Sequence, residues 1–307
     1  MDDKTKVRDI IRTNISTKRQ TSDKVMPSFF LLMASVSVIT TLGIIAVLVV
    51  DASKFFSAVP LTEVFSTKLA PLSANPSYGI LPLITGTLMT TIIAMIVAVP
   101  IGLGAAIYLS QFASSKLRRI LKPMMEILAG IPTIVYGFFA YSFVTPLLMN
   151  VIPSLQAKNA LSPGIVMGIM IIPMIASLSE DAMNSVPEIM REGALGLGAT
   201  KLETTFNVVV PAAISGIMAS IVLGVSRAIG ETMIVTIASG SSKNFTFDIT
   251  QSMQTMTAYI VEFTSGDAGG GTLGYYSLYA VGLVLFIFTL LINLLAQYIS
   301  RKYREVY

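Results

Sequence analysis

The sequence predicts an all-α, polytopic membrane protein with six transmembrane helices. Of its 307 residues, 53% are hydrophobic and only 12% are charged, and the mean hydropathy is +0.75. A soluble domain usually has about a quarter of its residues charged, because charged side chains cover its surface. This chain has too few charges for such a surface, so the surplus apolar surface must face lipid.

The composition also excludes several kinds of site. The chain has no cysteine and no histidine. Disulfides and thiolate metal sites are therefore impossible, and the commonest general base and zinc ligand is absent. We expect no catalytic residue, no metal and no cofactor in this chain.

Six stretches are long and apolar enough to span a bilayer, which takes about 20 residues of helix. They cover residues 29–50, 83–109, 124–149, 164–183, 208–237 and 275–299. The first stretch is too long for a signal peptide, and no small-residue cleavage site follows it. We therefore divide the chain into an N-terminal segment 1–28, a first helix 29–50, an outer loop 51–82, a core 83–300 with five helices, and a tail 301–307.

Lysine and arginine are distributed unevenly between the two sides of these helices. Sixteen of the 21 lie in the N-terminal segment, the tail and the loops that share their side, and the opposite side holds only Lys54, Lys68, Lys158 and Lys243. Basic loops stay in the cytoplasm, so both termini are predicted to be cytoplasmic, in a multi-pass protein of the cell membrane. The same asymmetry explains the net charge of +4 by contact with acidic lipid, without nucleic acid.

The loop between the fourth and fifth stretches predicts a short amphipathic helix at about residues 187–200. Pro187 suits the first turn of a helix, and Glu188 and Glu192 lie early in it, where the helix dipole favours negative charge. An apolar face is formed by Ile189, Ala194, Leu195 and Leu197. Such a helix either packs on its own protein or inserts into a soluble partner.

This loop resembles the signature of ATP-binding cassette importer permeases, which reads E-A-A, three residues, G, nine residues, I-x-L-P. The chain has the same spacing in Glu192-Gly193-Ala194, Gly198 and Val208-Val209-Val210-Pro211, with glycine for one alanine and valine at two apolar positions. The resemblance implies a type I importer permease fold. It also implies a cytoplasmic coupling helix that docks on an ATPase subunit through Arg191, Glu192, Ala194 and Gly198.

The ATPase must be a separate subunit, because the chain has no G-x-x-x-x-G-K-[ST] motif for nucleotide phosphates. Within the family the chain looks like the phosphate-specific permease of the PstC type, and the sibling PstA type is similar. The sharpest matching segment is Ser226-Arg227-Ala228-Ile229-Gly230-Glu231-Thr232-Met233. The resemblance implies four further subunits: a second homologous permease, two ATPases and an extracytoplasmic phosphate-binding protein. It places Arg227, Glu231 and Thr232 in the phosphate path.

Arg227 is also a candidate functional residue on physical grounds. It lies ten residues before Ile237, the predicted outer end of the fifth stretch, which is about 15 Å of helix. That is too far for the side chain to reach the interface, so we expect a buried charge with a function. An ion pair with Glu231 at i+4 is one interpretation, but arginine before glutamate is the weaker order. We favour a guanidinium that binds a phosphate oxyanion, with Glu231 keeping that binding weak.

Three other acidic residues lie near the predicted cytoplasmic ends of helices: Glu126, Glu180 and Asp181. We expect Glu180 and Asp181 to position the coupling helix and not to bind substrate. Two alternatives to phosphate import stay open. The cargo could be another oxyanion such as sulfate, molybdate or a phosphonate. An intramembrane enzyme would need a carboxylate pair or a Ser–Lys pair, and no lysine lies deep in a predicted helix.

Overall fold

A computed structural model describes residues 3–266 and 271–302, and the chain forms two compact units, residues 1–51 and 52–307. The first unit is helical throughout its described part. Its helix, α1 (Asp3–Ala58), continues past residues 28 and 50, where the sequence predicted boundaries. Residues 51–58 contain neither glycine nor proline, so nothing stops the helix before Pro60. Met26–Ala58 is apolar enough to cross a membrane, and its apolar window buries none of its residues inside the protein.

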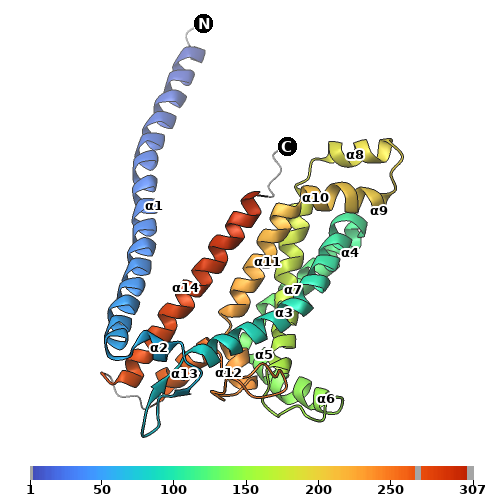
Figure 1. Cartoon of the computed structure of the whole chain (residues 1–307). Helices are drawn as coiled ribbons and strands as arrows, with labels where there is room; N and C mark the ends of the chain where they lie inside the picture. The colour runs from blue at the N-terminus through green and yellow to red at the C-terminus, as the bar shows by residue number, and fades with distance from the viewer. Residues whose placement is uncertain (1–2, 267–270, 303–307) are drawn as a thin grey trace. The chain divides into compact units, whose positions relative to one another are not determined.

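The second unit is a helical bundle. Two connections, at residues 59–80 and 239–255, fold at one end of it (Figure 1). Its longest helices are α3 (Leu81–Ile107), α7 (Leu161–Asn184) and α14 (Leu273–Lys302). A single pair of two-residue strands, β1 (Leu69–Ala70) and β2 (Ser77–Tyr78), interrupts the otherwise helical fold within the described residues. The remaining helices are α2 (Leu61–Val64), α4 (Ser115–Gly130), α5 (Thr133–Phe139), α6 (Thr145–Met149), α8 (Glu188–Gly196), α9 (Lys201–Thr204), α10 (Val210–Ala212), α11 (Ile214–Ile229), α12 (Met233–Ala238) and α13 (Met256–Ser265). Three π-helical turns lie at Tyr108–Phe112, Ala140–Val144 and Thr205–Val209.

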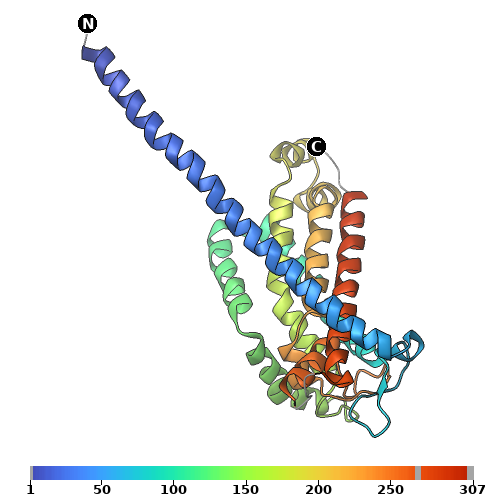
Figure 2. The ribbon, with the colours of Figure 1, turned by 90° about the vertical axis from the view of Figure 1, so that its left-hand side faces the viewer.

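The most buried of the apolar helices is α7, and Figure 2 shows it running between α4 and α11. Glycine lets α7 approach α3 closely: a Cβ added at Gly164 would lie 2.7 Å from the Ile93 side chain, and one at Gly168 would lie 2.7 Å from the Ala94 carbonyl oxygen. Small residues at helix contacts are typical of membrane bundles, where close packing replaces the hydrophobic effect.

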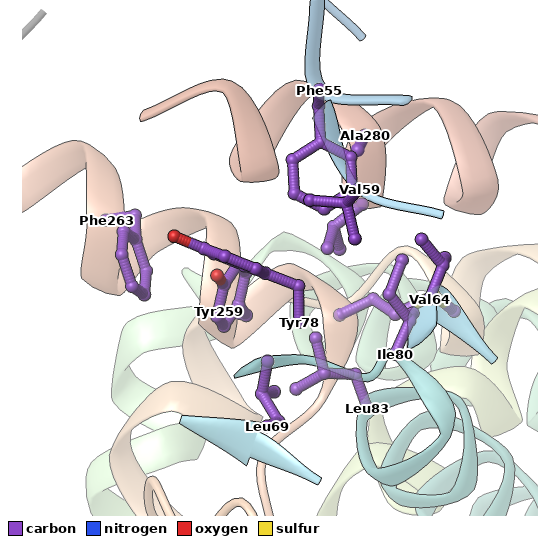
Figure 3. Packing of buried hydrophobic residues seen from close by; sticks show 12 residues of the cluster. Phe55, Val59, Val64, Leu69, Tyr78, Ile80, Leu83, Tyr259, Phe263 and Ala280 are labelled. Carbon is purple, nitrogen blue, oxygen red and sulfur yellow. The ribbon is translucent and has the colours of Figure 1, made fainter. Parts of the chain in front are cut away.

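At the end of the bundle opposite α8, distant parts of the chain share one apolar cluster. Phe55 and Val59, from the last part of α1, pack with Tyr78 and with Tyr259 of α13 (Figure 3). Gly86 of α3 meets the connection before α13 so closely that a Cβ there would lie 2.3 Å from the Gln254 carbonyl oxygen. The described parts of the predicted outer loops 51–82 and 238–274 are therefore folded against the bundle.

The prediction of an all-α membrane fold is confirmed, but two of the six spans are not straight. Four described helices are long and apolar enough to cross a membrane, and two bent pairs bring the number to six if each pair is one span. The predicted span 124–149 bends by 86° between Gly130 and Thr133, because Ile131 and Pro132 leave the helix. The predicted span 208–237 bends by 69° near Ala213 and breaks again after Ile229. The tail residues 303–307 lie outside the described residues.

Candidate functional site

The helix that carries Arg227 ends two residues after it. Residues 230–232 belong to neither α11 nor α12. Gly230 stands at this break, where a residue without a side chain weakens the helix. The Glu231 carboxylate is almost buried, and its Oε1 accepts hydrogen bonds from the backbone N–H groups of Met233 (3.1 Å) and Ile234 (3.4 Å). Glu231 thus satisfies the donors at the start of α12.

The other polar groups of the break also have partners. The Thr257 hydroxyl donates to the Glu231 carbonyl oxygen at 2.7 Å, and the Thr232 hydroxyl donates to the Gly230 carbonyl oxygen at 3.2 Å. Thr236 donates to the Thr232 carbonyl oxygen at 2.7 Å. A helix interrupted at membrane depth needs such substitutes for its own backbone hydrogen bonds.

The surroundings of Arg227 bear on two points of the sequence analysis. The helix does not continue to Glu231, so the i and i+4 pairing that the sequence left as an alternative is not formed, and no ion pair joins Arg227 to Glu231 in the described structure. Arg227 is not covered by its own chain: it is exposed on the single chain, with its Nη2 3.9 Å from the Met170 sulfur. Leu223 is exposed one turn earlier on the same face of α11.

The predicted amphipathic helix is present as α8, with Pro187 at its N-cap and Glu188 in its first turn. It is shorter than residues 187–200. Glu192 is exposed and Ala194 is half-buried. Arg191 turns back and donates to the Met183 carbonyl oxygen of α7. The apolar residues Ile189 and Leu197 are 78% and 92% exposed, so α8 does not bury this face in its own chain.

Gly198 closes α8 in the left-handed conformation, with φ = +93°. The Ala199 N–H bonds the Ala194 carbonyl oxygen and the Gly198 N–H bonds the Leu195 carbonyl oxygen, which is the Schellman arrangement. A Cβ at Gly198 would meet no atom within 4 Å. Backbone conformation and not crowding within the chain is therefore what favours glycine here.

A cluster of charges that the sequence did not predict as a unit lies where α7 meets α4. Glu180 is fully buried, with its Oε1 3.4 Å from the Arg118 Nε and its Oε2 3.2 Å from the Lys122 Nζ. Lys122 also lies 3.6 Å from an Asp181 oxygen. The sequence identified both acidic residues but gave no signal of their partners, which lie about 60 residues away. No group of three or more acidic side chains suited to a metal ion occurs among the described residues.

The long apolar helices, the two bent helix pairs and the exposed α8 are those of a membrane-embedded subunit with a helix outside its bundle. The chain belongs to the family described as binding-protein-dependent transport system inner membrane component, which matches residues 98–305. A probable ABC transporter permease protein, YqgH of Bacillus subtilis, is 34% identical over 243 residues, covering 79% of this chain and 78% of the relative. The phosphate transport system permease protein PstC of Mesorhizobium japonicum is 36% identical over 253 residues, covering 75% of this chain and 76% of the relative.

Solved structures agree on the fold. A chain of a bacterial alginate ABC transporter aligns with a TM-score of 0.64 at 14% identity, covering 96% of this chain and 98% of that chain. A chain of the MetNI methionine ABC transporter in an inward-facing conformation aligns with a TM-score of 0.56 at 17% identity, covering 73% and 96%. The type I permease fold is thus shared despite low identity, as the sequence predicted.

Proposed function

We propose that this chain is the PstC-type permease of an ATP-driven phosphate importer. The observation that carries the proposal is the similarity to several phosphate transport permeases over about three quarters of the chain. The break at residues 230–232 supports it. The exposed Arg227 lies at the end of α11, directly before this break, inside the fifth apolar stretch. A charge in such a place is costly and is usually functional.

Phosphate would pass the exposed face of α11 at Arg227. A guanidinium group presents a planar fork that matches two phosphate oxygens. Glu231 and Thr232 lie in the same break. The negative charge of Glu231 would oppose prolonged binding of the anion, so that phosphate can leave again.

The remaining parts of the proposed importer are a second homologous permease, two ATPase subunits and an extracytoplasmic phosphate-binding protein. The apolar face of α8, with Ile189, Leu195 and Leu197 exposed, suits insertion into an ATPase. Arg191, Glu192, Ala194 and Gly198 would form or shape this contact. Both termini and α8 would be cytoplasmic, as the distribution of lysine and arginine indicates.

The test is uptake into vesicles that contain the complete complex and enclose ATP. We expect ATP-dependent accumulation of labelled phosphate when loaded binding protein is supplied outside. Excess sulfate, molybdate or phosphonate should not compete. Uptake of one of those oxyanions in place of phosphate would refute the substrate and retain the importer.

A further inference from the structure

The buried carboxylate of Glu180 joins three helical segments at the α8 end of the bundle. It comes from α7, and its two cationic partners, Arg118 and Lys122, come from α4. The Glu180 side chain is 0% exposed, whereas those of Arg118 and Lys122 are 36% and 35% exposed. The carboxylate therefore depends on these partners, while the cations retain contact with water.

The same arginine holds the π-helical turn Tyr108–Phe112, which continues α3. Arg118 donates from Nε to the Leu109 carbonyl oxygen at 3.1 Å and from Nη2 to the Ser110 carbonyl oxygen at 3.1 Å. Ser110 in turn donates to the Asn184 side chain at 2.7 Å, and Asn184 lies one helical turn beyond Glu180 on α7. The ends of α3, α4 and α7 are thus connected by one continuous set of polar contacts, which we name the Glu180 joint.

The Glu180 joint lies next to α8. Arg191 of α8 donates to the carbonyl oxygen of Met183, three residues after Glu180. Met183 is itself buried, in a cluster that includes Val186 and Val209 on either side of the α8 segment. A displacement of α8 therefore acts directly on the part of α7 that carries Glu180.

The far end of the bent span that begins with α4 reaches the break near Arg227. The bend leads into α5, where a Cβ at Gly137 would lie 3.1 Å from the Met233 carbonyl oxygen and 3.2 Å from the Ile234 Cα. The N–H groups of Met233 and Ile234 are the ones that Glu231 binds. Backbone contact this close leaves α5 and α12 little room to move independently.

We propose that Glu180 is a positioning residue that makes α4 and α8 move as one body, so that ATP-driven movement of α8 reaches the break beside Arg227. This inference rests on the proposed importer function. Removing one partner of a buried ion pair is strongly unfavourable, because the other charge is left without compensation. The Glu180 joint therefore resists separation of α4 from α7 when α8 is displaced.

Glu180→Gln tests this role in the complete complex reconstituted in vesicles, with ATP hydrolysis and phosphate uptake measured in the same preparation. The exposed cations can be hydrated, so the complex should assemble and hydrolyse ATP. The phosphate moved per ATP should fall about fivefold or more, the size of a typical coupling between sites. Arg119→Gln, which removes an exposed cation from the same turn of α4, is the matched control and should leave this ratio unchanged.

A second variant keeps the proposal testable if the complex with Glu180→Gln does not assemble. Lys122→Gln leaves Glu180 paired with Arg118 and should lower the same ratio. Combined with Glu180→Gln it should cause little further loss, because both changes remove the same contact between Lys122 and Glu180, and the other partner of Lys122, Asp181, is exposed. A wild-type ratio in assembled Glu180→Gln and in Lys122→Gln would overturn the proposal.

A distance measurement tests this inference independently of which substrate the importer carries. The chain has no cysteine, so spin labels at Lys116→Cys on α4 and Glu188→Cys on α8 mark defined positions. The distance between the labels should be the same with and without ATP in the otherwise wild-type chain, and it should change or broaden with ATP in Glu180→Gln. A wild-type complex that moves no phosphate would refute the proposed function but not this result. A distance that shifts with ATP in the wild-type chain would refute the Glu180 joint.

Discussion

At the break after α11, two charged side chains of one short segment have different surroundings. Arg227 is exposed on the single chain, whereas Glu231 is 7% exposed and bonded to backbone N–H groups of α12. The exposure of Arg227 is compatible with its proposed contact with phosphate, and Glu231 fixes the conformation of the segment next to it. The positive charge also lies at the C-terminal end of α11, where the helix dipole favours it.

The double change Arg227→Gln with Glu231→Gln should give a complex that assembles and does not transport phosphate. A glutamine at position 231 still offers an amide oxygen to the two N–H groups, so the break should persist. Arg227→Lys should also lower uptake, because an ammonium group is a point charge without the planar fork. The measurement is phosphate uptake into vesicles, with the amount of complex determined separately.

Glu231→Ala tests the structural role of Glu231 separately from the anion-binding role proposed for Arg227. It leaves two donors without an acceptor, and we expect a loss of about 1–3 kcal/mol in stability, seen as a lower Tm of the complex. Glutamine at the same position should lower Tm less. Uptake near the wild-type level in the double glutamine variant would show that Arg227 does not serve transport.

Gly198 is the residue at which backbone conformation most limits substitution in the α8 segment. With φ = +93°, a side chain there costs about 1–2 kcal/mol. Gly198→Leu should therefore distort the end of α8, and it should reduce both the ATPase that purifies with the complex and the uptake. Gly198→Asn should be milder, because asparagine tolerates the left-handed region.

Glu192→Lys reverses an exposed charge on α8 and should weaken the ATPase contact without affecting membrane insertion. Quantitative recovery of the ATPase with Gly198→Leu and with Glu192→Lys, together with normal transport, would contradict the coupling role of α8.

At the scale of elements, apolar length and spacing predicted the helices but not their bends. The stretch 164–183 became α7, and the helix at about 187–200 became α8, since both follow from local sequence. The 86° bend at Ile131 and Pro132 lies inside an uninterrupted apolar run, so a hydropathy argument could not detect it. The partners of Glu180 depend on how α4 packs against α7, and no local pattern carries that information.

Two of the three glycines of α3, Gly86 and Gly104, allow a direct test of its packing. Gly86→Ala would place a Cβ 2.3 Å from the Gln254 carbonyl oxygen, so the connection before α13 must shift at a cost of about 1–3 kcal/mol. Gly104→Ala meets no atom within 4 Å and should be neutral or stabilising by up to about 1 kcal/mol. The measurement is the Tm of each purified complex. Equal Tm values for the two variants would contradict the close contact between α3 and residue 254.

At the scale of the whole molecule, charge distribution is the property that sets the orientation in the membrane. The sequence predicted it from the 16 cationic residues on one side, and the number of candidate spans, up to six, is compatible with both termini on that side. The alternative of an ion pair between Arg227 and Glu231 treated the fifth stretch as one continuous helix, and the break after Ile229 removes the geometry that this pair would need. Composition therefore determines the class of protein, and packing determines what each charge contacts.

Single cysteines test the orientation, since the chain has none of its own. Ser265 and Ser115 are both exposed, on α13 and at the start of α4. A membrane-impermeant thiol reagent should label Ser265→Cys in intact cells and should leave Ser115→Cys unlabelled until the cells are opened. The reverse pattern would refute cytoplasmic termini.

The apolar cluster opposite α8 has a consequence for how the protein is made. It joins Phe55 and Val59 to Tyr259, Phe263 and Ala280, and the Met256 N–H bonds the hydroxyl of Thr87, 169 residues earlier. While the ribosome is still producing the middle of the chain, the early members of this cluster have no partners. This end of the bundle can therefore close only when the last helix enters the bilayer, and a chain truncated before α13 would leave an open apolar surface that quality-control proteases can recognise.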